Sequence, residues 1–92
     1  MMEKISPCKC GSAPLFTPYY QSNDGNHDAP ASVICPICGR STVMGWKLWR
    51  EVEEEVGDEK YERPTAYLSQ RFMDALNDAT IRKWNRENGG DR

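Results

Sequence analysis

The sequence lacks any long apolar run, and this absence limits where the protein can act. Only 38% of its 92 residues are hydrophobic, and no stretch approaches the roughly 20 apolar residues that a membrane-spanning helix needs. No apolar run precedes the first cysteine, so we expect no signal peptide. These absences predict a cytoplasmic protein without a membrane segment.

Histidine, the commonest catalytic acid and base, is also scarce. The chain has one histidine, His27, within a turn-forming cluster at 22–28, and no spacing pairs a nucleophile with a base. It contains no glycine-rich phosphate-binding loop. We therefore expect a protein that is not an enzyme.

A basic excess is missing as well. The formal net charge is −2, and residues 50–60 carry six acidic and two basic residues. Because nucleic-acid binding draws much of its affinity from neutralising phosphates, a nucleic-acid partner is not expected. The acidic run could mimic DNA phosphates through Glu53, Glu54 and Glu55, but a solvated helix face is the plainer interpretation.

Four cysteines are present, and they form two pairs. Cys8 lies one residue from Cys10, Cys35 lies two residues from Cys38, and 24 residues separate the pairs. Cytoplasmic cysteine pairs are more often metal ligands than disulfides. We predict that the four thiolates hold one structural Zn²⁺, which leaves no open coordination position for water or substrate. Two disulfides, iron in place of zinc, and His27 as a ligand in place of Cys8 remain alternatives.

The two pairs differ in their local sequence. The stretch "CPICG" at 35–39 has the usual gap of a zinc knuckle, and its glycine lets the chain turn with a positive φ. The stretch "CKCG" at 8–11 is one residue shorter. Residues i and i+2 of an extended segment point to the same side, so a bend at Lys9 would still let both cysteines reach one ion.

The hydrophobic pattern changes from strands to helices along the chain. We expect strands within 14–21, 31–36 and 40–46, with a hairpin turn at Asp24-Gly25. Residues 46–56 have helical spacing, and Gly57 would end that helix.

A second helical pattern opens at Pro64, and Asn77 could cap a separate final helix. Its apolar stripe includes Phe72 and Leu76 and continues to Trp84. The whole pattern predicts one α+β domain over residues 1–92. Its parts would be a zinc ribbon of two or three antiparallel strands at 1–45, helices at 46–88 packed on the ribbon, and a disordered tail at 89–92.

Trp46 and Trp49 lie three residues apart in the first helix. A small ribbon needs apolar cover, so we expect both indoles in the core. If exposed, they would be interface anchors instead. Trp49 is therefore a candidate partner-binding residue, together with the three glutamates of the acidic run.

Three short motifs carry a resemblance to a known family. They are "PCKCGS" at 7–12, "CPICGR" at 35–40 and "IRKWNR" at 81–86. Together they resemble the restriction alleviation (Lar) proteins of phages and prophages, which usually read P-C-P-x-C-G-S, then C-P-x-C-G, then a short helix that ends in W-N-R. This chain departs from the family in its shorter first knuckle and in an added segment at 46–75.

The resemblance implies a function and a compartment. It implies a protein of the host cytoplasm that protects phage DNA by binding subunits of a host type I restriction–modification system, so that modification gains over cleavage. From the residues alone, we expect Trp84 to pack the helix end onto the ribbon and Asn85 to hydrogen-bond nearby backbone. Two rival interpretations remain. One is a nucleic-acid-binding ribbon with a basic strip of Arg71, Arg82, Lys83 and Arg86, and the other is a structural module that oligomerises through its tryptophans.

Overall fold

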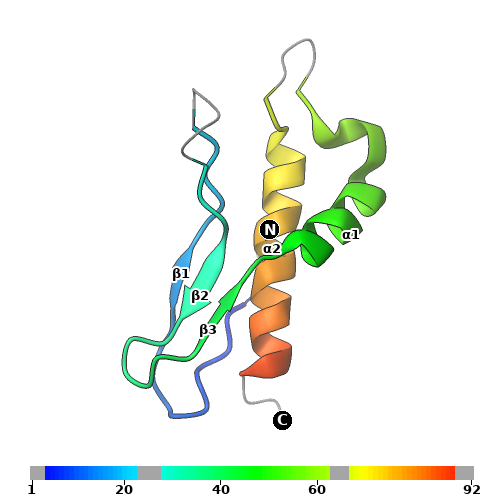
Figure 1. Ribbon diagram of the computed structural model, residues 1–92. Helices are drawn as coiled ribbons and strands as arrows, with labels where there is room; N and C mark the ends of the chain where they lie inside the picture. The colour runs from blue at the N-terminus through cyan, green and yellow to red at the C-terminus, as the bar shows by residue number, and fades with distance from the viewer. Residues whose placement is uncertain (1–3, 23–27, 63–66, 89–92) are drawn as a thin grey trace.

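The computed structural model describes residues 4–22, 28–62 and 67–88. In these ranges a three-stranded antiparallel sheet is followed by two α-helices and a short 3₁₀ helix between them (Figure 1). The strands are β1 (Leu15–Thr17), β2 (Ser32–Ile34) and β3 (Ser41–Val43), in the order β1-β2-β3. The predicted α+β architecture of a small ribbon with helices packed on it is confirmed.

The sheet has one inner and one outer face. Val33 of β2 lies opposite Phe16 on one side and Thr42 on the other. Because side chains alternate along a strand, these three residues share the face toward the helices, where Val33 and Thr42 are buried. The three strands fall within their predicted ranges, and β1 ends just before Pro18, which has no N–H for a sheet hydrogen bond. The predicted Asp24-Gly25 turn lies outside the described residues.

The first helix, α1 (Trp46–Val56), has the predicted bounds. Its buried side chains, Leu48, Val52 and Val56, recur every four residues on one face. Gly57 ends the helix with a φ of 65°, and the chain continues into η1 (Gly57–Lys60). The apolar periodicity and the glycine that follows it therefore predict the bounds of α1 from the local sequence alone.

The second helix, α2 (Gln70–Glu87), differs from its prediction in two respects: the residue at which it begins, and the absence of a break at Asn77. Pro64 lies outside the described residues, but Leu68 pairs with Tyr61 in an isolated β-bridge, so the helix does not begin before it. The hydroxyl of Ser69 accepts a hydrogen bond from the N–H of Phe72 and caps the helix. The helix then runs without a break, so the expectation of a cap at Asn77 is wrong.

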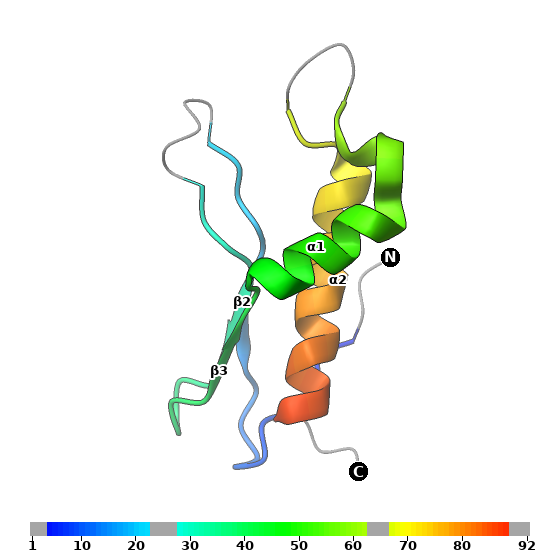
Figure 2. The ribbon, with the colours of Figure 1, turned by 45° about the vertical axis from the view of Figure 1, so that its right-hand side comes forward.

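Two apolar clusters lie along α2. The first joins α1 to the N-terminal half of α2 through Phe72 and Leu76, and the second joins the sheet to the C-terminal half through Ile81 and Trp84. Figure 2 shows α1 crossing in front of α2, with the sheet at its side. Helix α2 is thus the element on which both other parts pack.

The two tryptophans of α1 have different environments. Trp49 is partly buried in the first cluster, where its ring meets that of Phe72 edge-on at 5.0 Å, as expected for a core position. Trp46 is 82% exposed, so the expectation of a core role for this residue is wrong. It is the first residue of α1 and lies away from the face that packs on α2.

Candidate metal centre

The four cysteines meet at one end of the sheet. The first pair precedes β1, and the second pair forms the turn between β2 and β3. All four Sγ atoms lie within 4.8 Å of one another, with 3.4 Å between Cys8 and Cys38 and 3.5 Å between Cys10 and Cys35. Four sulfurs around one Zn²⁺ at about 2.3 Å would be separated by roughly 3.8 Å, so the cluster has the dimensions of a tetrahedral thiolate site.

The sulfur atoms are not joined to one another. A disulfide bond is about 2.05 Å long, and the shortest contact here is 3.4 Å. All four cysteines are free thiols. The predicted cluster of four cysteines is therefore present, and it can bind a metal ion. His27, the alternative ligand, lies outside the described residues.

The outer hydrogen bonds of the two knuckles correspond. The N–H of Cys8 donates to the carbonyl of Ser12 at 2.9 Å, and the N–H of Cys35 donates to the carbonyl of Arg40 at 2.8 Å. In each knuckle the first cysteine thus bonds to the residue two positions after the second cysteine. The first knuckle therefore has one residue fewer between its two cysteines, but it keeps the hydrogen bond that closes the second knuckle.

The inner turns correspond as well. The N–H of Gly11 donates to the carbonyl of Cys8 at 2.8 Å, and the N–H of Gly39 donates to the carbonyl of Cys35 at 3.0 Å. Both glycines have a positive φ, 95° and 83°, which residues with a Cβ rarely adopt. The glycine after each pair therefore closes the knuckle, and the one-residue gap of the first pair is compatible with chelation.

Backbone amides also act on the sulfurs. Hydrogen bonds from the hydroxyl and the N–H of Ser12 lower the pKa of Cys10 to about 6, and the N–H of Arg40 lowers the pKa of Cys38. At Cys8 the N–H of Cys10 acts in the same direction, but burial and hydrogen bonds to the other thiols outweigh it and raise the pKa to about 11. The thiolate is the form that binds metal, so these hydrogen bonds prepare the exposed Cys10 and Cys38 as ligands.

The C-terminal end of α2 holds the segment that leads into the first knuckle. The indole N–H of Trp84 donates to the carbonyl of Ser6 at 2.9 Å. The side-chain oxygen of Asn85 accepts from the N–H of Ser6 at 2.8 Å, and its amide nitrogen donates to the carbonyl of Lys4 at 2.9 Å. The expected roles of Trp84 and Asn85 are thereby confirmed.

Two of the four thiols belong to the hydrophobic core on this side of the molecule. Cys8 and Cys35 are buried, and they form one cluster with Val33, Ile81 and the fully buried ring of Trp84. A metal ion held by the four sulfurs would therefore bind directly against the packing between sheet and helix.

Two buried asparagines of α2 and its C-cap make hydrogen bonds that the sequence pattern did not predict. Asn77, expected as a cap, is buried in α2 and accepts a hydrogen bond from the N–H of Tyr19 at 2.8 Å. Asn88 is also buried, and its amide donates to the hydroxyl of Thr42 at 3.1 Å. An asparagine on the buried stripe of a helix is the sequence signal that indicates such contacts.

The candidate partner-binding residues do not form one patch. Trp49 is partly buried in the core, and Glu53 forms an ion pair with Lys60, whose hydrogen bond lowers the pKa of Glu53. Glu54 and Glu55 are exposed on α1. Their proposed role in binding a partner stays a prediction.

The basic residues of the nucleic-acid alternative are interleaved with acids. Arg71 pairs with Glu59 at 2.7 Å. Lys83 and Arg86 line a hollow between the helices that also contains Lys47, Glu51 and Glu87. Arg82 is exposed on α2. This arrangement mixes charges where a phosphate-binding strip would concentrate positive charge.

Comparisons with protein-family models, curated proteins and solved structures gave no match for this chain. The resemblance to the restriction alleviation family therefore depends on the motif residues alone. Within the described ranges, neither helix combines the length and the hydropathy needed to cross a membrane.

Proposed function

We propose that this protein is a small zinc ribbon that holds one structural Zn²⁺ through Cys8, Cys10, Cys35 and Cys38. The observation that carries the proposal is the convergence of all four Sγ atoms within 4.8 Å. An all-thiolate tetrahedral set favours zinc or an iron site, and zinc is the usual ion of paired knuckles in ribbons. Four protein ligands fill the coordination sphere, so the ion stabilises the fold and offers no position for a substrate.

We further propose that the protein acts by binding another protein in restriction alleviation. The support is the way in which the resembling motifs come together. Trp84 and Asn85 of the late motif contact the backbone directly before the early motif, and Trp84 packs beside Cys8 and Cys35. Motifs from the two ends of the chain thus form a single structural unit, which gives a physical reason for them to occur together.

A plating assay tests this function. Unmodified phage is plated on a host with a type I restriction–modification system, with and without expression of the chain. We expect a higher plating efficiency with the chain, and no effect in a matched host that lacks the restriction genes. The Cys35→Ser/Cys38→Ser variant, expressed to the same level, should not raise the efficiency.

A plating efficiency that does not change when the zinc-loaded chain is expressed would overturn the restriction proposal. It would not contradict the zinc site. A nucleic-acid-binding ribbon is the second candidate, because three cations, Lys47, Lys83 and Arg86, line one hollow, against two acids, Glu51 and Glu87. It predicts retardation of DNA in a gel at low salt that disappears as salt is raised. A chain that leaves DNA unretarded at low salt excludes this candidate.

A further inference from the structure

The four cysteines of the metal centre differ in exposure in a regular way. Cys8 and Cys35, the first cysteine of each pair, are 4% and 0% exposed, whereas Cys10 and Cys38 are exposed. The two buried cysteines belong to the core around Trp84. A small oxidant dissolved in water can therefore reach one cysteine in each knuckle.

The short sulfur–sulfur contacts join the two knuckles to each other. The Sγ of the exposed Cys38 lies 3.4 Å from that of the buried Cys8. The Sγ of the exposed Cys10 lies 3.5 Å from that of the buried Cys35. Each exposed sulfur thus has a buried sulfur of the other knuckle as a near partner, and a disulfide of about 2.05 Å needs a closure of about 1.4 Å in each pair.

A link across the knuckles also restricts the chain more than a link within one knuckle. Cys8 and Cys38 are 30 residues apart, and Cys10 and Cys35 are 25 residues apart. The alternatives inside a knuckle span only two or three residues. Because the constraint that a disulfide places on the unfolded chain grows with the length of the closed loop, the cross-knuckle pairs are the more stabilising.

The knuckles themselves carry positive charge and no negative charge. Residues 7–12 include Lys9, residues 34–40 include Arg40, and neither stretch contains an acidic residue. Both basic side chains are exposed beside the exposed cysteines. Reactive cysteines occur in partly exposed surroundings of positive charge, whereas cysteines in buried apolar surroundings are inert.

We propose that the four-cysteine site is a peroxide-sensitive switch, in which oxidation joins Cys10 to Cys35 and Cys38 to Cys8 and the chain releases its metal ion. This inference rests on the zinc site proposed above and assigns a regulation to it. Thiolates are the ligands, so each disulfide removes two of the four. The knuckles stay joined, by covalent bonds in place of the ion.

The oxidation proceeds in two steps for each disulfide. The exposed thiolate attacks one oxygen of hydrogen peroxide, the O–O bond breaks, and the departing hydroxide takes a proton from water, so that the sulfur becomes a sulfenic acid. The buried thiolate of the other knuckle then attacks this sulfur. The S–S bond forms, the S–O bond breaks, and the second hydroxide also becomes water. Two thiolates have lost two electrons, and one peroxide has become two waters.

A zinc-release experiment on the reduced, zinc-loaded full chain tests the switch. Excess hydrogen peroxide is added, and free zinc is measured with a colorimetric indicator. We expect one zinc ion to be released per chain, and none from the same chain without peroxide. Dithiothreitol followed by zinc should restore full zinc content, because this thiol reduces disulfides but not methionine sulfoxide, the other common product of peroxide.

Peptide mapping without reduction identifies the pairing. After free thiols are blocked, cleavage on the C-terminal side of lysine and arginine and on the N-terminal side of aspartate gives fragments 5–9, 10–23 and 28–40, which separate Cys8 from Cys10. Cross-knuckle disulfides join all three fragments in one species. Disulfides within the knuckles join 5–9 to 10–23 and leave 28–40 separate. Fragmentation between Cys35 and Cys38 in the mass spectrometer shows which cysteine holds which partner.

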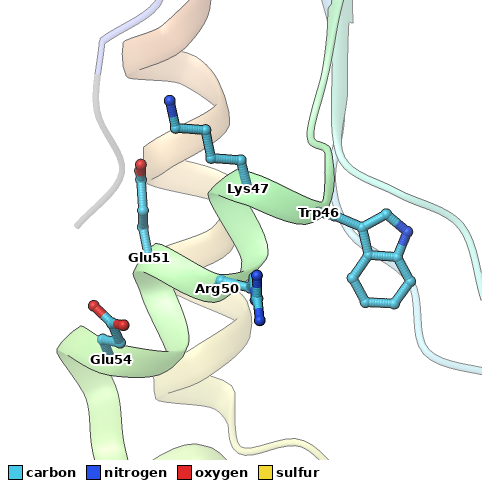
Figure 3. A pocket seen from close by; sticks show the side chains of 5 residues that line it. All are labelled: Trp46, Lys47, Arg50, Glu51 and Glu54. Carbon is cyan, nitrogen blue, oxygen red and sulfur yellow. The ribbon is translucent and has the colours of Figure 1, made fainter.

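Tryptophan fluorescence gives a second readout from the site. Trp84 packs in one cluster with Cys8 and Cys35, whereas the 82% exposed ring of Trp46 projects from α1 (Figure 3). The variant Trp46→Phe removes this exposed ring and leaves the metal centre unchanged. Its remaining emission should change together with zinc release, and it should return after reduction and addition of zinc.

Three results would overturn the switch: zinc that stays bound in excess peroxide, disulfides confined to single knuckles, or a release that reduction and zinc do not reverse. A reduced chain that never contains zinc would instead contradict the zinc site itself. Peptide mapping of the peroxide-treated, metal-free chain would then still test the cross-knuckle pairing, so the two failures are distinguishable.

Discussion

At the residue scale, Gly11 and Gly39 determine how the cysteine pairs close. Their φ angles of 95° and 83° lie in the region that favours glycine, yet a Cβ at either position would meet no atom within 4 Å. Alanine at these positions would therefore affect the backbone conformation alone. The cost of a left-handed conformation for a residue with a Cβ is about 1–2 kcal/mol.

We predict that Gly11→Ala and Gly39→Ala each lower the free energy of unfolding of the zinc-loaded protein by about 1–2 kcal/mol. Denaturant titration measures the loss. Lys9→Ala is the control, since it changes an exposed side chain within the first knuckle and leaves both glycines in place, and it should change stability by about 0.5 kcal/mol or less. A loss in only one knuckle would mean that the two turns are not equivalent.

The residues of the metal centre could be predicted because their chemistry is local in the sequence. Spacing alone identified Cys35 and Cys38, and Gly11 after the shorter pair marked the same turn. Trp46 was assigned to the wrong environment for a physical reason. Its three-residue separation from Trp49 indicates a shared side of the helix, but does not indicate where along α1 the packing surface ends.

At the scale of elements, the C-terminal end of α2 is the part of the fold that fixes the first knuckle. Asn85 makes two hydrogen bonds to the segment before Cys8, and Trp84 makes one in addition to its buried packing. These hydrogen bonds, in addition to apolar packing, let a helix from the other end of the sequence hold the segment before Cys8 in place.

We predict that Asn85→Ala destabilises the zinc-loaded protein by about 1 kcal/mol, because the part-buried N–H of Ser6 loses its acceptor, while water can solvate the exposed carbonyl of Lys4. Arg86→Ala is the control on the same turn of α2, and its exposed side chain predicts a change of about 0.5 kcal/mol or less. Thermal unfolding of both variants checks the difference. Equal losses would contradict a specific role for Asn85.

The helices show which element features a sequence can reveal. Helix α1 matched its prediction because apolar periodicity and Gly57 act within the helix itself. Helix α2 did not, because its start depends on the pairing of Leu68 with Tyr61 and on Ser69. The role of Asn77 depends on Tyr19, which is 58 residues away and meets it only after folding.

At the scale of the whole molecule, α2 connects two cores that depend on the metal to different degrees. The core shared by α1 and α2 contains no cysteine, whereas the core shared by the sheet and α2 includes Cys8 and Cys35. Removal of the ion would leave four thiols gathered without a common partner. The sheet side should therefore lose its structure first.

We predict that a strong chelator increases amide hydrogen exchange in residues 8–17 and 32–43 and in the last turns of α2 before it does so in α1. Hydrogen-exchange mass spectrometry over a time course measures this order. The same chelator saturated with zinc is the control and should change nothing. A uniform increase over the whole chain would show that the two cores unfold as one unit.

The metal content of the purified native protein is the measurement that bears most directly on the four-thiolate site. Elemental analysis combined with native mass spectrometry should find one zinc ion per chain, with all four cysteines as free thiols after the metal is removed. The Cys35→Ser/Cys38→Ser variant should lose this stoichiometric zinc. A native chain that contains no metal, or one whose cysteines are joined as disulfides, would contradict the site on which this account of the fold and function depends.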